Sequence, residues 1–138
     1  MIMPILAVRD VEASAAFYTQ KLGFNQDTLM AGPDGKPAFA IVSLGQAMIG
    51  LGADPALPAR GAGVELMVYV PDGADLDGLY ADVQARGVPV AAPIQDQYWG
   101  DRTFSVHDPD GFHITLSKAV RQVPMEEMAA IMRGEQPA

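Results

Sequence analysis

The apolar residues of this chain change their spacing along its length, and these changes divide its first third into strands and a helix. Residues 2–8 are typical of a strand. Residues 9–23 predict a helix, because apolar side chains recur there at helical spacing and Gly23 follows where glycine often ends a helix. Apolar runs over 24–31, 37–44 and 46–51 predict three more strands, and GPDGK forms a turn between the first two.

The same order of elements then repeats. Residues 53–63 are rich in proline, glycine and alanine and predict a linker. The elements expected after it are a strand over 64–70, a helix over 75–87, and strands near 88–97, 101–107 and 112–117. Two halves with the same order predict an α+β fold built from two βαβββ modules. We place module one at 1–52 and module two at 64–118, within one domain over 1–120.

Residues 121–138 predict a C-terminal helix and tail. Pro124 suits the first helical position, and Glu126 and Glu127 suit the first turn. The apolar stripe of this helix consists of Met125, Met128, Ala129 and Met132. A methionine stripe can bind a ligand, but docking on its own domain or on a partner subunit is the more common use.

The stretch HDPDGFHITLS contains both histidines of the chain. Its DPDG sequence predicts a type I turn followed by a left-handed Gly111, which places His107 opposite His113 on neighbouring strands. Alternation then gives two faces. Phe104, Val106, Phe112, Ile114 and Leu116 form an apolar face. Thr103, Ser105, His107, His113, Thr115 and Ser117 form a polar face, which we expect to line a cavity or to face water.

Composition excludes several classes of function. The net charge is −8, and a field of that sign disfavours binding to nucleic acid. It would suit a cationic or metal-bearing ligand, although acidity also promotes solubility. The chain has no cysteine, so disulfides, thiolate catalysis and thiolate-bound metals are excluded. No apolar run is long enough for a membrane span and no signal peptide is evident, so we expect a cytoplasmic protein.

Four motifs resemble the vicinal oxygen chelate superfamily, the group of glyoxalases, bleomycin resistance proteins and ring-cleaving dioxygenases. They are Val8-Arg9-Asp10-Val11, Phe17-Tyr18, Leu22-Gly23-Phe24 and Asp108-Pro109-Asp110-Gly111. The resemblance implies two curved half-barrel sheets that enclose a cavity, and a homodimer. It specifies the fold but no reaction.

Metal enzymes of this group hold a divalent ion with His, Gln or Glu from set strand positions. The resemblance places these positions on Met3, Gly50, Glu65 and Thr115, and of these only Glu65 is a good ligand. We therefore expect no metal cofactor. His107 and His113, with Glu65, are weak candidates for a different metal site, and His113 is a candidate general base.

Most candidate ligand-binding residues come from module two. They are Glu65, Met67, Tyr69, Tyr98, Trp99, Arg102, His113 and Thr115. Phe39 is a further candidate from module one. Trp99 could stack on a planar ligand. Equally, Trp99 could cap the core while Arg102 pairs with a surface acid, and Met67 and Tyr69 could fill the core.

Three functional hypotheses follow. The first is a metal-independent protein of the bleomycin-resistance type that sequesters a small organic molecule, without catalysis. The second is a metal-dependent lyase, isomerase or dioxygenase that uses Glu65 and His113. The third is a scaffold or regulatory module whose cavity is filled by its own side chains. The sequence leaves open whether the protein is an enzyme.

Overall fold

A computed structural model of the protein describes residues 2–56 and 64–135 and contains two four-stranded sheets. The first sheet has the order β1-β4-β3-β2 and the second the order β5-β8-β7-β6. In each sheet the first strand of the module, β1 or β5, lies at one edge and runs parallel to its neighbour. The first four strands are β1 (Ile5–Val8), β2 (Asn25–Ala31), β3 (Pro37–Leu44) and β4 (Ala47–Ala53). The other four are β5 (Glu65–Tyr69), β6 (Val90–Asp96), β7 (Asp101–His107) and β8 (His113–Ala119). The expected α+β fold with two βαβββ modules is confirmed. The predicted linker falls partly on residues 57–63, which lie outside the described residues.

One helix covers each sheet. They are α1 (Val11–Ala16), continued by the wider turn η1 (Phe17–Lys21), and α2 (Leu76–Ala85). Asp10 and Asp75 cap the two helices by accepting a hydrogen bond from the backbone N–H three residues later. The predicted helix over 9–23 is therefore an α-helix for only its first part, and its second part is π-helical.

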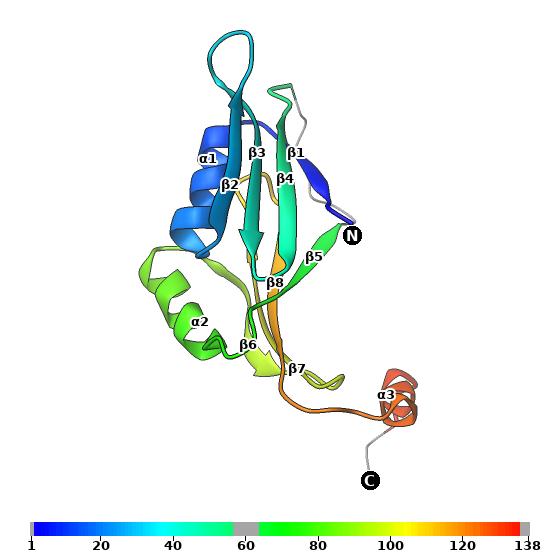
Figure 1. The fold of residues 1–138 in the computed structure, drawn as a ribbon. Coiled ribbons are helices and arrows are strands. Elements are labelled where there is room, and N and C mark those ends of the chain that lie inside the picture. Colours follow the sequence, from blue (N-terminus) through cyan, green and yellow to red (C-terminus); the bar gives the residue numbers. More distant parts are fainter. Residues whose placement is uncertain (1, 57–63, 136–138) are drawn as a thin grey trace.

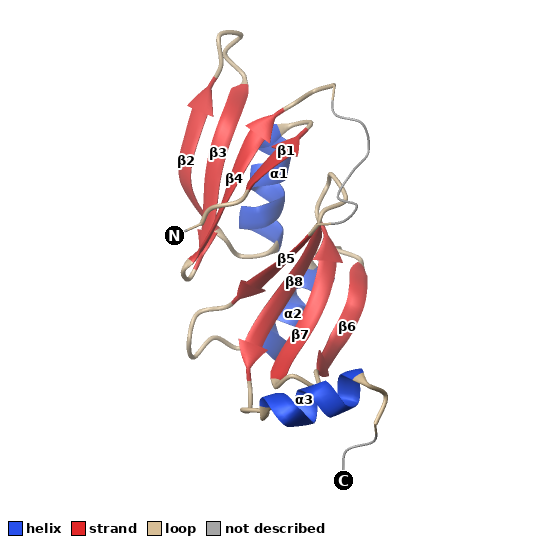
Figure 2. Ribbon diagram, turned by 90° about the vertical axis from the view of Figure 1, so that its right-hand side faces the viewer, coloured by secondary structure: helices blue, strands red, loops and turns tan. Residues whose placement is uncertain are grey.

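Both helices lie on the same side of the molecule, as Figure 2 shows. Alternate residues of each sheet turn toward the helices and are fully buried, among them Val8, Val42, Phe104 and Leu116. This buried face is the core of each module. We call the opposite face of each sheet the open face, because no helix of the same module covers it (Figures 1 and 2).

The DPDG turn has the predicted register. His107 pairs with His113, the Asp108 N–H donates to the Phe112 carbonyl at 3.0 Å, and Gly111 has a φ of 87°. A residue with a side chain would be strained at this φ, which explains the glycine. The apolar and polar faces expected for β7 and β8 follow directly from this register.

The two aspartates of this turn join the modules. Tyr18 Oη donates to Asp108 Oδ2 at 2.8 Å, Ser14 Oγ donates to Asp110 Oδ2 at 3.2 Å, and the Arg9 backbone N–H donates to Asp110 Oδ1 at 3.1 Å. Ser14 and Tyr18 are one helical turn apart and face the turn together. The turn of module two is therefore held against α1 and η1 of module one.

Burial dominates the chemistry of this contact. It raises the pKa of Asp108, which the hydrogen bond from Tyr18 lowers only in part. Burial and the neighbouring Asp108 also raise the pKa of Tyr18 well above its usual range, so the phenol stays a donor. A second contact between the modules lies at the surface, where Lys21 Nζ donates to the Arg86 carbonyl and an Arg86 guanidinium nitrogen donates to the Lys21 carbonyl.

The C-terminal helix α3 (Met125–Met132) lies beyond the second sheet, away from both cores (Figure 1). Pro124 precedes the helix as its N-cap rather than occupying its first position. Met125 and Met132 are exposed, so the predicted stripe is not buried on the chain's own domain. Instead Tyr98 Oη contacts Met132 Sδ at 2.9 Å, and Arg121 pairs with Glu127 at 3.8 Å. No helix in the described ranges is long and apolar enough to span a membrane.

We predict that Tyr18→Phe lowers the free energy of unfolding by about 1–3 kcal/mol, because it leaves a buried acceptor on Asp108 without its phenol donor. Thermal and denaturant unfolding would measure this. Tyr80→Phe is the matched control, since the Tyr80 ring packs on Phe104 at 5.0 Å within module two. Equal effects of the two changes would contradict the role given to the contact between Tyr18 and Asp108.

Candidate functional site

Five of the predicted site residues lie together on the open face of the second sheet. Strand β5 supplies Glu65, Met67 and Tyr69, and β8 supplies His113 and Thr115. They share a face because Glu65 pairs with His113 and Met67 pairs with Thr115 in the parallel ladder. Met67 and Tyr69 are exposed on this face, so neither fills the core.

The floor of this face consists of hydroxyl side chains, of which Thr115 and Ser105 are bonded to each other. Thr115 Oγ1 donates to Glu65 Oε1 at 2.6 Å and lies 2.8 Å from Ser105 Oγ. Thr103 Oγ1 accepts from Gln97 Nε2 at 2.9 Å. Although these side chains lie on the predicted polar face, Thr103, Ser105 and Thr115 are buried rather than open to water. Short hydroxyl side chains are covered by their larger neighbours.

The two histidines are adjacent, as predicted. His113 Nδ1 and His107 Nε2 are 3.3 Å apart, and His113 Nε2 is 3.8 Å from Glu65 Oε1. His107 is exposed and His113 is half-buried. Within residues 2–56 and 64–135, no three His, Cys, Asp or Glu side chains are grouped so that they could hold a metal ion.

The ladders also test the four positions at which the resemblance implies metal ligands. Ile5 pairs with Gly50 in module one, and Met67 pairs with Thr115 in module two. Each first strand of a module is followed by a similar segment, Val8-Arg9-Asp10 in module one and Val70-Pro71-Asp72 in module two. When these segments are aligned, Ile5 corresponds to Met67 and Met3 corresponds to Glu65. The assignment of the four positions is therefore consistent between the modules.

The residues at these positions do not fit a divalent metal. A Cβ on Gly50 would lie 3.1 Å from Ile5 Cγ1 and 3.3 Å from the Phe39 ring, so apolar side chains occupy the space that a ligand there would need. Thr115 already donates its hydroxyl hydrogen to Glu65. A thioether, a glycine and a hydroxyl beside one carboxylate are a poor donor set for Mg, Mn, Fe, Ni or Zn.

Tyr98 and Trp99 lie in the tight loop between β6 and β7. The Gly100 N–H donates to the Gln97 carbonyl at 3.1 Å, and Gly100 has a φ of 103°. A Cβ on Gly100 would collide with the Arg121 carbonyl, so only glycine fits there. The rings of Tyr98 and Trp99 meet edge to face at 5.2 Å.

Asp101 is a site residue that the sequence analysis missed. It is 6% exposed, and its Oδ2 accepts hydrogen bonds from Tyr69 Oη at 2.6 Å and from Trp99 Nε1 at 2.9 Å. The bond to Asp101 raises the pKa of Tyr69 to about 12, and desolvation adds to the shift. The sequence did hold a signal for it, because Asp101 alternates with Thr103 and Ser105 of the predicted polar face and lies two residues after Trp99.

Arg102 does not share this face, so its choice as a ligand-binding residue is corrected and the alternative, pairing with a surface acid, is the one found. Its side chain turns toward α2 and pairs with Asp77 of that helix at 2.8 Å. It also pairs with Asp96 of β6 at 2.9 Å. Alternation explains this, because Arg102 is two residues from Phe104 and therefore on the core side. Arg102 also holds the pKa of Asp77 below its usual value through their hydrogen bonds.

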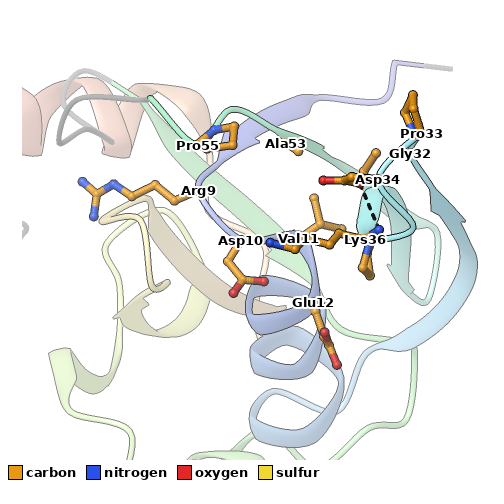
Figure 3. A pocket seen from close by; sticks show the side chains of 12 residues that line it. Arg9, Asp10, Val11, Glu12, Gly32, Pro33, Asp34, Lys36, Ala53 and Pro55 are labelled. Atoms are coloured by element: carbon orange, nitrogen blue, oxygen red, sulfur yellow. Dashed lines mark hydrogen bonds between the residues drawn. The ribbon is translucent and has the colours of Figure 1, made fainter.

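The described part of the chain includes three surface pockets, two of them near these elements. One of about 250 Å³ lies between the two modules, where Glu65 and Met67 meet Met48 of β4. One of about 550 Å³ lies between Trp99 and the segment that leads to α3. The third, of about 760 Å³, lies at the far end of module one and is shown in Figure 3. It is lined by charges of both signs, including Glu12 and Lys36, and by none of the predicted site residues.

Comparisons with known proteins agree with this architecture. A model of the Glyoxalase/Bleomycin resistance protein/Dioxygenase superfamily matches residues 2–116. An uncharacterised protein of Mycobacterium bovis, Mb0911c, is 28% identical over 96% of this chain and 91% of its own length. A bleomycin resistance protein of Geobacillus stearothermophilus is also 28% identical, over 86% of this chain and 96% of its own length.

Solved structures are similar as well. The bleomycin resistance determinant encoded on transposon Tn5 has a TM-score of 0.63 at 25% identity and covers 86% of this chain and 97% of its own. TioX from Micromonospora sp. ML1 has a TM-score of 0.66 at 21% identity and covers 90% and 99% of the two chains. The latter likeness concerns the fold alone.

We predict that Asp101→Asn lowers the pKa of Tyr69 from about 12 toward the ordinary value near 10, because the anionic acceptor is lost. The bond stabilises the fold fully below pH about 10, and this stabilisation disappears as the pH rises through about 12. NMR titration of ring-labelled tyrosine would follow the resonance. A pKa of Tyr69 that is the same in both proteins would contradict the bond.

Proposed function

The chain belongs to the glyoxalase/bleomycin resistance protein/dioxygenase superfamily, and we propose that it binds and sequesters a small organic molecule without a metal cofactor. The ligand lies on the open face of the second sheet, over Glu65, Met67 and Tyr69, and contacts Trp99 at the end of that face. Binding uses burial of an apolar or aromatic group, and polar side chains orient the ligand.

One observation supports metal independence most directly. Two of the positions where the superfamily resemblance implies metal ligands, Glu65 and Thr115, are hydrogen-bonded to each other at 2.6 Å. A third, Gly50, lies beneath Ile5 and Phe39. The groups that would hold a metal are absent or engaged, whereas the surrounding face keeps polar and aromatic groups that can contact an organic ligand.

The ligand we propose is cationic. The chain has a net charge of −8, which attracts cations to its surface. Glu65 is exposed on the open face, and several relatives that are 28% identical are named bleomycin resistance proteins. Bleomycin is therefore the first compound to test, and the protein would act in the cytoplasm.

We further propose a homodimer. The open face of the first sheet is mostly apolar and includes exposed side chains, among them Ile5 at 62% and Met30 at 53% exposure. Both open faces lie on the same side of one chain, so neither covers the other (Figure 2). A second copy, related by a twofold axis, would place its apolar first sheet over the polar second sheet of this chain and enclose the ligand.

We predict that metal-free protein, dialysed against a chelator, binds a cationic organic ligand as tightly as untreated protein. Calorimetric titration and thermal unfolding with bleomycin, followed by other cationic drugs, would measure this. Ligand at 100 times its Kd should stabilise the fold by about 2.7 kcal/mol. Glu65→Gln should weaken binding about tenfold, since a hydrogen bond to a charged group contributes about 1.5 kcal/mol.

Glu12→Gln is the matched control. It removes the same charge from an exposed residue of α1, far from the open face. No stabilisation by any compound would contradict the proposal. Stoichiometric metal that is lost in His113→Ala would instead favour the metal-dependent enzyme, for which His113 lies 3.8 Å from Glu65.

We predict that the protein sediments at about twice its chain mass of 14.6 kDa and that Ile5→Lys makes it monomeric, because a charge would be buried in the apolar contact. Analytical ultracentrifugation measures both. A chain that ends at Val123 keeps the bonds from Val120 and Arg121 to Gly100, so it tests α3 alone. A monomeric parent protein would contradict the dimer.

A further inference from the structure

Asp101 is a buried carboxylate whose two side-chain donors among the described residues are both neutral. The phenol of Tyr69 and the indole of Trp99 donate to the same oxygen, Oδ2, at 2.6 and 2.9 Å. Nearby cations point elsewhere: Arg102 pairs with Asp77 and Asp96 on the helix side, and Arg121 pairs with Glu127. A buried carboxylate is costly unless a charge or strong donors compensate it, so a cationic partner would be favoured there.

Tyr69 reaches Asp101 across an intervening strand. Tyr69 belongs to β5 and Asp101 to β7, and β8 lies between them. Because Ser117 of β8 pairs with both Tyr69 and Thr103, the Tyr69 ring must pass over β8 close to Ser117 to reach Asp101. Tyr69 nevertheless remains 50% exposed, and its hydroxyl is held by this hydrogen bond.

The hydroxyl group of Ser117 gives a second, independent observation. Ser117 is 0% exposed, and its Oγ is buried with no hydrogen-bond partner among the described residues. Ser117 lies on the open face, on the rung between Tyr69 and Thr103. An unpaired buried hydroxyl is unfavourable, so a ligand that supplied a partner would be bound more tightly.

Aromatic rings stand beside these polar groups. Trp99 is half-buried and packs edge to face against Tyr98, which keeps the indole in place next to Asp101. Tyr69 supplies a second ring. The indole N–H of Trp99 and the hydroxyl of Tyr69 both point at Asp101, so the two rings flank the carboxylate with their edges. An ammonium group that enters there is bound by the carboxylate, which accepts its charge-assisted N–H bonds.

We propose that Asp101 anchors the protonated amine of the ligand, with Trp99 and Tyr69 as the walls of this subsite. The Tyr69 hydroxyl occupies the place of the ammonium group when no ligand is bound, and it swings aside when the amine donates to Asp101. Tyr69 keeps its proton throughout. A second N–H of the ammonium group reaches Ser117 Oγ. This inference rests on the proposed ligand-binding function and specifies the chemical group that is recognised.

The test uses the fluorescence of Trp99, which is the only tryptophan of the chain and lies in the subsite. Titration of the full-length protein with benzylammonium at neutral pH should change the emission in a saturable way. Benzyl alcohol has a similar shape without the charge and should bind at least about tenfold more weakly, since it cannot make the charge-assisted hydrogen bonds. Equal binding of the two compounds would overturn the proposal.

Three variants sharpen the result. Asp101→Asn should weaken benzylammonium binding about tenfold or more, whereas Asp96→Asn, the same change on the helix side of the same sheet, should leave it unchanged. Tyr69→Phe should tighten binding about threefold, because the competing hydroxyl is removed. Unchanged binding in Asp101→Asn, or weaker or unchanged binding in Tyr69→Phe, would overturn the proposal.

Two readouts keep the conclusion unambiguous. If circular dichroism shows that Asp101→Asn does not fold, the comparison of benzylammonium with benzyl alcohol and the Tyr69→Phe variant decide the question. If bleomycin or another cationic drug binds the parent protein and folded Asp101→Asn equally well, this inference fails while the proposed function stands. If no organic compound binds the parent protein, the proposed function itself fails.

Discussion

The position of the two modules depends on one buried hydrogen-bonded contact, between the aspartates of the DPDG turn and the first helical segment. Asp108 accepts from Tyr18, and Asp110 accepts from Ser14 and from the Arg9 backbone. Both carboxylates are buried, so each must keep its donors or cost several kcal/mol. Because the donors belong to module one and the acceptors to module two, this requirement fixes how the two sheets sit side by side. The turn therefore does more than reverse the chain.

This arrangement places both helices on one side and leaves both open faces on the other. The two faces differ in character. The first is apolar, with Ile5 and Met30 exposed, and the second is polar, with hydroxyl groups beneath Glu65 and Tyr69. An apolar wall can bury the hydrophobic part of a ligand, and a polar wall can orient its charged part. The proposed dimer follows from this difference, because it brings unlike faces together.

The same polar face carries the proposal that this chain binds its ligand without a metal. Where four ligands would be needed, the chain has Met3, Gly50, Glu65 and Thr115, and the last two are bonded to each other. Of these four residues, only Glu65 carries a negative charge. A second carboxylate, Asp101, is buried beside Trp99 at the other end of the face. In the proposed function, this face therefore attracts a cation as part of a ligand rather than holding one as a cofactor.

The sequence alone determined the order of the elements, the two modules and the register of the last hairpin, because each depends on local patterns. Period-two alternation on β7 and β8, together with the glycine that the turn requires at 111, leaves one register that separates apolar from polar residues. The same alternation, applied to Arg102, would have placed it on the core side, but it was grouped with its neighbour Trp99 as a ligand-binding candidate. Only the tertiary structure decided that Tyr18 bonds Asp108, 90 residues away, and that Tyr69 crosses β8 to reach Asp101. Such contacts depend on how separate segments pack in space, and no periodicity within either segment encodes the partner that packing brings to it.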